Sequence, residues 1–246
     1  MARFILLDTE TTGVEEKDRI CQLAFLVADK SGVTAYDSLC KPPLPVEFKA
    51  MSIHHITNEM LEDKPAFEHC EAAHKLRELN TPDNIMVIQN APFDLGMLEK
   101  EGVIWQGELI DTLRCIKHLE PHHESHALQY LRYALGFYKE EKALADQLGV
   151  EIKPHDALSD VIVLHLLMKY LVSKVDRDVN RLIELTRTPI LYEFITFGAK
   201  YKRGVDRLED IAATDPQYLE WALAKMETLD EDARYSIRHY LGKDDA

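Results

Sequence analysis

The chain opens with an apolar run at residues 4–7 that is followed at once by two carboxylates, Asp8 and Glu10. Such a run predicts a buried strand, and because strand side chains alternate between faces, Asp8 and Glu10 should point the same way. Neighbouring carboxylates repel each other and cost desolvation unless a cation lies between them, and a divalent metal usually fills that role. Gly13, three residues later, lets the backbone turn sharply and approach a ligand.

A second acidic segment follows the strand-like run at residues 85–88. Pro92 suits the first turn of a helix, where its missing N–H is no loss, and Asn90 is well placed near the helix cap. Asp94 should therefore project from a helix start, close to the end of the preceding strand.

A third segment leads into the apolar stretch at residues 161–171. Asp156 can cap that helix, and Asp160 falls in its first turns. Pro154 keeps His155 outside the helix, so we expect His155 on a loop and Asp160 on a rigid element.

Together the three segments resemble the DEDDh group of DnaQ-like 3′→5′ exonucleases. The resemblance implies an α/β fold, with a ribonuclease H-like mixed sheet flanked by helices. It implies a catalytic set made of four acids and one histidine: Asp8, Glu10, Asp94, Asp160 and His155.

In that family, phosphodiester hydrolysis depends on two divalent ions, Mg²⁺ or Mn²⁺, which suit carboxylate oxygens. One ion generates hydroxide and the other stabilises the leaving 3′-oxygen. By resemblance, Asp8 would bridge both ions, Glu10 and Asp160 would hold the water-activating ion, and Asp94 would support the second. His155 would take the proton from the attacking water, because an imidazole with a pKa of about 6.5 is largely neutral near pH 7.

Further positions resemble the family's nucleotide-contacting residues. The turn at residues 53–57 carries His55 where the family usually has glycine, and Gln89 stands where a histidine is common. The substrate-binding residues implied by the resemblance are Thr9, Thr12, Gly13, Ile53, His54 and Asn90.

The C-terminal part, at residues 197–204, 211–221 and 239–241, resembles the tail module of exonuclease X-like deoxyribonucleases, with Ala199 as an extra residue. This resemblance is the argument for DNA. It implies a 3′→5′ exodeoxyribonuclease that releases nucleoside 5′-monophosphates from single-stranded DNA or from the 3′ ends of duplex DNA, in DNA repair or recombination. Lys200, Lys202, Arg203 and Arg207 form a local basic cluster around Tyr201, for which DNA contact and a plain hairpin surface remain equal alternatives.

Composition argues against a basic nucleic-acid-binding groove. The net charge is −14, from 29 Lys and Arg against 43 Asp and Glu, whereas phosphate binders are more often basic. Metal ions would bring positive charge to the site itself. Two alternatives stay open: an exoribonuclease of the same fold, because the active site does not distinguish the sugar, and a catalytically idle nucleic-acid-binding scaffold.

A break between the predicted elements divides the chain into two parts, an exonuclease domain at 1–185 and a small, mainly helical module at 190–246. Strands are expected at 3–8, 20–28, 33–40, 84–89 and 107–111. Helices are expected near 67–79, 92–101, 112–119, 126–136, 156–173 and 216–226, with another starting at 230. Four cysteines without close spacing fit a reducing cytoplasm. The opening apolar run is too short for a signal peptide, so we expect a cytoplasmic protein without membrane contact.

Overall fold

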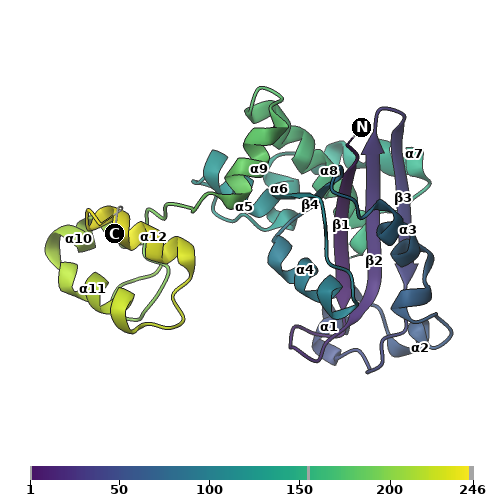
Figure 1. Ribbon diagram of the computed structural model, residues 1–246, viewed down its shortest axis with the longest axis horizontal. Coiled ribbons are helices and arrows are strands. Elements are labelled where there is room, and N and C mark those ends of the chain that lie inside the picture. The colour runs from purple at the N-terminus through teal and green to yellow at the C-terminus, as the bar shows by residue number, and fades with distance from the viewer. Residues whose placement is uncertain (1, 154–155, 244–246) are drawn as a thin grey trace. The chain divides into compact units, whose positions relative to one another are not determined.

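The computed structural model describes residues 2–153 and 156–243. The chain divides into two compact units, Met1–Thr186 and Arg187–Ala246, and in Figure 1 the second is the yellow-green end of the chain. His155, the expected general base, lies outside the described residues.

A mixed sheet forms the centre of the first unit, with the strand order β3-β2-β1-β4-β5. Its strands are β1 (Phe4–Thr11), β2 (Ile20–Asp29), β3 (Gly32–Leu39), β4 (Ile85–Ile88) and β5 (Glu108–Asp111). The first three strands pair antiparallel, whereas β4 runs parallel to both β1 and β5. The predicted α/β class with a mixed sheet is confirmed.

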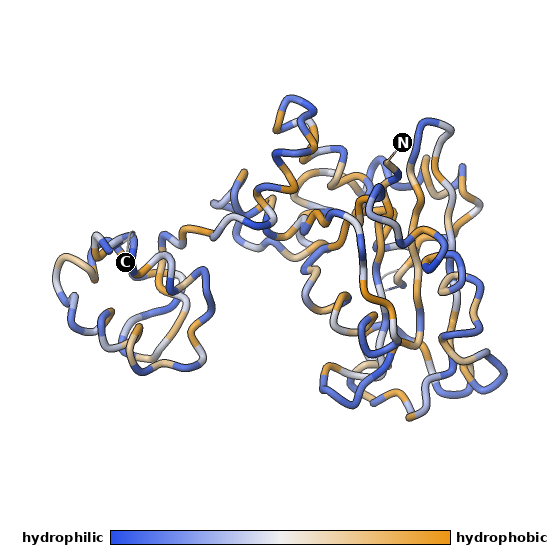
Figure 2. The backbone as a smooth tube through the Cα atoms, in the orientation of Figure 1, coloured by the Kyte–Doolittle hydropathy of each residue, from blue (hydrophilic) through white to orange (hydrophobic). Residues whose placement is uncertain are grey.

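Helices cover both faces of this sheet because side chains alternate along each strand. Leu6 packs in one core with α8 (Ala157–Lys174), α5 (Thr112–Leu119), α6 (Leu128–Ala134) and α7 (Glu141–Leu148). Ile5 and Leu7 pack in the other core with α3 (Glu71–Leu79) and α4 (Ala91–Lys100). Figure 2 shows the hydrophobic stretches along the inner strands, while the tip between β2 and β3 is hydrophilic.

Most expected elements are present, with shifted ends. β1 continues to Thr11, beyond its predicted end at residue 8. The helix expected at 67–79 starts as a 3-10 turn, Phe67–His69, before α3. The sequence did not predict the helices α1 (Phe48–His54), α2 (Asn58–Leu61), α7, α9 (Val179–Arg187) and α10 (Leu208–Thr214).

The second unit has its own hydrophobic core, built by α10, α11 (Pro216–Lys225) and α12 (Glu231–Tyr240). Ile195, Leu208, Leu219, Ala222 and Ile237 are fully shielded within it. Their burial lets these 60 residues form a compact unit of their own. Across the described part of the chain, no helix combines the length and the apolar character needed to cross a membrane.

Candidate active site

Asp8 and Glu10 lie near the carboxyl end of β1, opposite Ala24 and Gln22 of β2. Leu6, two residues before Asp8, belongs to the core beneath α8, so both carboxylates face the side of the sheet that α8 covers. The pairing register between β1 and β2 shifts between Glu10 and Thr11. The sequence-based expectation that the two acids share a face therefore holds.

The turn after β1 is tightly fixed. Asp18 is buried and accepts hydrogen bonds from the Thr12 hydroxyl (2.7 Å) and the Glu15 amide (2.7 Å). A Cβ atom at Gly13 would lie 2.5 Å from Asp18 Oδ2, so any side chain there would displace Asp18. Thr12 and Gly13 thus shape the turn, and the Thr12 hydroxyl is already engaged within the protein.

Asp94 lies in the first turn of α4 and is buried. The Thr9 hydroxyl donates to Asp94 Oδ1 at 2.7 Å, which ties the carboxylate to β1. Asn90 occupies the N-cap position in a left-handed conformation (φ 68°), but its side chain makes no capping bond. Asp111 supplies that function, because its carboxylate accepts from the Asn90 and Ala91 amides, both at 3.1 Å.

Asp160 lies in the first turn of α8, and Asp156 caps this helix by accepting from the Ser159 amide at 3.1 Å, as predicted. The Gln129 side-chain amide donates to Asp160 Oδ1 at 2.5 Å. Arg132 donates to Gln129 Oε1 at 3.3 Å. The Asp160 carboxylate is thus held by α6 as well as by its own helix.

Gln22 connects β2 to the start of α8. Its side-chain amide donates to Asp37 Oδ1 and to Asp156 Oδ1, both at 3.0 Å, and its oxygen accepts from the Ala157 amide at 3.3 Å. Because Gln22 is buried, these bonds are shielded from water and fix the position from which α8 begins.

The four acids form one electrostatic cluster. Burial, followed by the charges of Asp94, Asp160 and Glu10, raises the pKa of Asp8 well above its usual range. Burial and the charges of Asp160 and Asp94 raise the pKa of Glu10 to about 8. Burial raises the pKa of Asp94 and that of Asp160 to about 7 each, although hydrogen bonds from Thr9 and Gln129 oppose the shift.

This electrostatic arrangement fits a divalent cation. Four carboxylates come from three separate elements, and each keeps its proton to a higher pH than usual, chiefly because it is buried and, for Asp8 and Glu10, also because the other acids lie near. Hard cations such as Mg²⁺ and Mn²⁺ prefer oxygen ligands of this kind. A bound cation would remove the repulsion and favour the ionised carboxylates.

The turn around His54 bears on the expected nucleotide contacts. The His54 ring accepts from the Ile56 amide at 3.0 Å, so its other ring nitrogen donates to the Thr11 carbonyl at 3.1 Å. Both nitrogens are therefore engaged within the protein, one with the end of β1 and the other with the turn that follows α1. Ile53 is 47% exposed and open to contact, while His55 adopts the left-handed conformation (φ 62°) that explains the family's usual glycine here.

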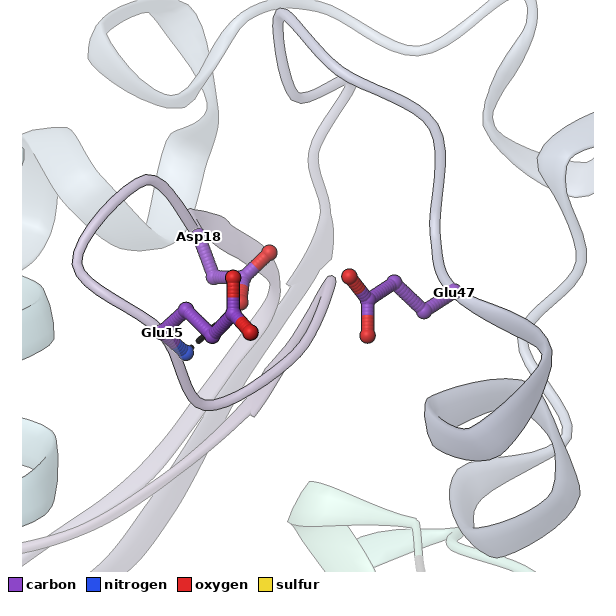
Figure 3. Close-up of side chains that lie close together, drawn as sticks. All are labelled: Glu15, Asp18 and Glu47. Carbon is purple, nitrogen blue, oxygen red and sulfur yellow. Dashed lines mark hydrogen bonds between the residues drawn. The ribbon is translucent and has the colours of Figure 1, made fainter.

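A second acidic cluster lies at the turn after β1, where Glu15 and Asp18 approach Glu47 at the start of α1 (Figure 3). Lys17 forms ion pairs with Glu15 (3.1 Å) and Glu47 (3.2 Å). These acids are therefore compensated by a protein cation.

Two residues that shape the site carry no clear sequence signal: Gln22 and Gln129. Gln22 looked like an interior position of a buried strand, and Gln129 like an ordinary polar helix residue. Asp111 directly precedes a predicted helix, and this was the one available signal for a cap.

Comparison with known proteins adds to this geometry. A family model described as "Exonuclease" matches residues 5–168. Exodeoxyribonuclease 10 of Escherichia coli K12 is 29% identical over 241 residues, covering 96% of this chain and 97% of that protein. DNA polymerase III subunit epsilon of Rickettsia typhi is 36% identical over 103 residues, covering 40% of this chain and 44% of its own.

Two solved structures share the fold. Exonuclease X in complex with 5′ overhanging duplex DNA superposes with a TM-score of 0.57 at 23% identity, covering 74% of this chain and 99% of that one. E. coli exonuclease I in complex with a dT13 oligonucleotide gives a TM-score of 0.56 at 20% identity, covering 74% of this chain and 43% of that one.

Proposed function

Since the chain belongs to the exonuclease family whose model spans residues 5–168, we propose that it is a divalent-metal-dependent 3′→5′ exodeoxyribonuclease. It releases nucleoside 5′-monophosphates from the 3′ ends of single-stranded or duplex DNA, in repair or recombination. The observation that carries the metal dependence is the convergence of four carboxylates with raised pKa values.

Asp8, Glu10, Asp94 and Asp160 would hold two ions, Mg²⁺ or Mn²⁺. When bound, these ions supply positive charge that offsets the phosphodiester's negative charge and lower the pKa of attacking water. The chain carries a net charge of −14, which by itself disfavours binding of an anionic substrate. The ions would offset this by bringing positive charge to the site.

The protein's own residues orient the carboxylates and transfer a proton. Thr9 and Gln129 restrict the rotation of Asp94 and Asp160 through hydrogen bonds of 2.7 and 2.5 Å, so that little reorganisation is needed when substrate arrives. By resemblance, His155 accepts the proton of the water that attacks phosphorus, while the bond from phosphorus to the 3′-oxygen breaks. Asp156, the neighbour of His155, is fixed by Gln22 and by its own capping bond.

The choice of DNA rests on likeness along the chain. The E. coli relative aligned over 96% of this chain is called an exodeoxyribonuclease, and its alignment extends beyond the catalytic unit into the second one. The carboxylate cluster itself has no feature that selects between deoxyribose and ribose. The substrate preference therefore depends on residues outside the cluster.

A matched pair of single-stranded DNA and RNA oligonucleotides, each labelled at the 5′ end, tests the proposal. With Mg²⁺ we expect a ladder of DNA shortened from the 3′ end and slower loss of RNA. Asp8→Asn, which removes one charge without changing side-chain size, should be folded and inactive. Faster RNA degradation would identify an exoribonuclease, and DNA binding without any product would identify an idle scaffold.

A further inference from the structure

The second unit carries three aromatic rings in contact, Tyr201, Tyr218 and Trp221, which we call the aromatic platform. Trp221 stacks on Tyr218 with ring centroids 5.8 Å apart and planes inclined by 27°. Tyr201 meets Tyr218 edge-on at 5.2 Å. Trp221 is nevertheless 52% exposed, so the run of rings ends at a large aromatic surface that is open to solvent.

Two rings of the platform, Tyr201 and Tyr218, are closely held by their neighbours. The Tyr201 hydroxyl donates to Asp215 Oδ2 at 2.7 Å. Gly198 has φ 69°, and a Cβ atom there would lie 2.1 Å from the Tyr218 hydroxyl. Only glycine therefore lets the backbone approach Tyr218 so closely, and the ring loses little freedom when a ligand binds.

Positive charge surrounds these rings. The Lys200 ammonium lies 5.5 Å from the Tyr201 ring centroid and 5.2 Å from that of Tyr218, and it forms an ion pair with Asp215. Lys202 and Arg203 are exposed on the same turn, and Arg203 Nε donates to the Gly198 carbonyl at 2.9 Å. Three cations thus share this turn and its surroundings with two carboxylates, Asp215 and Asp206, in a chain that is otherwise strongly acidic.

The unit's core does not depend on Trp221. Leu219 and Ala222, its neighbours on α11, are fully buried, whereas the Trp221 side chain turns to the exposed side of that helix. The core of the second unit thus leaves out this half-exposed indole, which stacks on Tyr218.

We propose that the aromatic platform binds single-stranded DNA by stacking an unpaired base on Trp221, with Lys202 and Arg203 beside the backbone phosphates. Aromatic rings take every base because each has a π-face, and adjacent cations attract the phosphates. This inference rests on the proposed function and gives the second unit a task in it, which is to hold DNA that extends beyond the catalytic site.

The basic cluster expected from the sequence therefore offers less free positive charge for DNA than its four residues suggest. Lys200 is paired with Asp215, and Arg207 is paired with Glu193 and Glu209. These two cations are already compensated within the protein, so phosphate attraction alone is weaker than four basic residues suggested. Base stacking supplies the remaining interaction.

The test measures binding of a fluorescently labelled oligo-dT of about 20 nucleotides by anisotropy, with the full chain in excess chelator so that no hydrolysis is needed. Trp221→Ala should weaken binding about 5- to 100-fold, as expected for one lost stacked base, whereas Trp221→Phe should stay close to wild type. Val205→Ala, which removes another exposed apolar side chain from this unit, is the matched control and should change nothing.

Two outcomes would overturn the proposal. One is Trp221→Ala binding as tightly as wild type, and the other is a fully base-paired hairpin binding as well as oligo-dT and losing as much affinity in Trp221→Ala. Hydrolysis of a trinucleotide should be unaffected by Trp221→Ala. If wild-type protein bound oligo-dT through Trp221 but hydrolysed no DNA, the proposed enzymatic function would be wrong, whereas DNA binding by the aromatic platform would be supported.

Discussion

Metal-free protein should lose stability as pH rises from 5 to 8, because of the acidic cluster. The pKa of Glu10 is raised to about 8 and those of Asp94 and Asp160 to about 7. A carboxyl group with a raised folded-state pKa binds its proton more tightly in the folded state than in the unfolded one. Its stabilising contribution is complete below the unfolded pKa near 4 and disappears as pH rises through 7 to 8.

The magnitude follows from the number of extra protons held. Because protonation of one carboxylate relieves its neighbours, we count one net proton for the cluster rather than three. One proton gives a slope of about −1.4 kcal/mol per pH unit, hence a loss of about 4 kcal/mol in the free energy of unfolding from pH 5 to pH 8. Bound Mg²⁺ at 100 times its dissociation constant should restore about 2.7 kcal/mol at pH 8.

The assay is urea unfolding followed by tryptophan fluorescence in a Trp221→Phe background. Only two tryptophans exist, so Trp105, which packs in the first unit, then reports on that unit alone. Asp160→Asn is the matched control, since an amide can still accept the Gln129 hydrogen bond without adding charge. It should flatten the pH dependence and gain about 1–2 kcal/mol at pH 8 without metal. A metal-free stability that stayed level or rose between pH 5 and pH 8 would show that the acidic cluster does not destabilise the folded protein.

Three further changes test single residues. His155→Ala should keep metal affinity, measured by titration calorimetry, yet lose about 10²–10⁴-fold in rate; equal loss of metal binding would make His155 a ligand instead. Gln22→Leu leaves Asp37 and Asp156 without their shared hydrogen-bond donor, so the free energy of unfolding should fall by about 1–3 kcal/mol. The hydrolysis rate should fall by a larger factor than the KM changes. Unchanged stability and rate would show that Gln22 does not position the start of α8. Gly13→Ala places a Cβ atom against Asp18 and should lower stability by about 1–3 kcal/mol in urea unfolding, whereas a silent variant would mean that the turn can relax.

The parts of the fold that the sequence predicted are those governed by local rules. Alternation placed Asp8 and Glu10 on one face of β1, and capping preferences put Asp156 at the start of α8. The mixed sheet followed from three early strands and a later alternation of strands and helices. The family resemblance supplied the assignment of chemistry to these acids.

The contacts that complete the site depend on long-range folding. Gln22 and Asp156 are separated by 134 positions in the chain, and no local pattern marks their hydrogen bond. The hydrogen bond from Gln129 to Asp160 joins two different helices, α6 and α8. Asn90 was expected to help cap α4, but Asp111 caps it instead because β4 and β5 are neighbours in the sheet.

The short helices escaped prediction for a related reason. The seven residues of α1 bury only His54, so they offer no apolar periodicity. The eight residues of α7 bury Glu141 and Ala145, and Glu141 is held there by its ion pair with Arg132. In the sequence alone, a buried acid such as Glu141 looks like a surface residue, because its ion-pair partner Arg132 is not marked by any local pattern.

We propose that the carboxylates of Asp8, Glu10, Asp94 and Asp160 act by holding divalent ions. The most direct measurement is the rate at which metal-stripped protein shortens 5′-labelled single-stranded DNA in excess chelator, before and after an excess of Mg²⁺ is added. We predict no shortening before the addition and progressive loss of nucleotides from the 3′ end after it. Hydrolysis that continued at full rate in excess chelator would show that the carboxylates do not act through divalent ions.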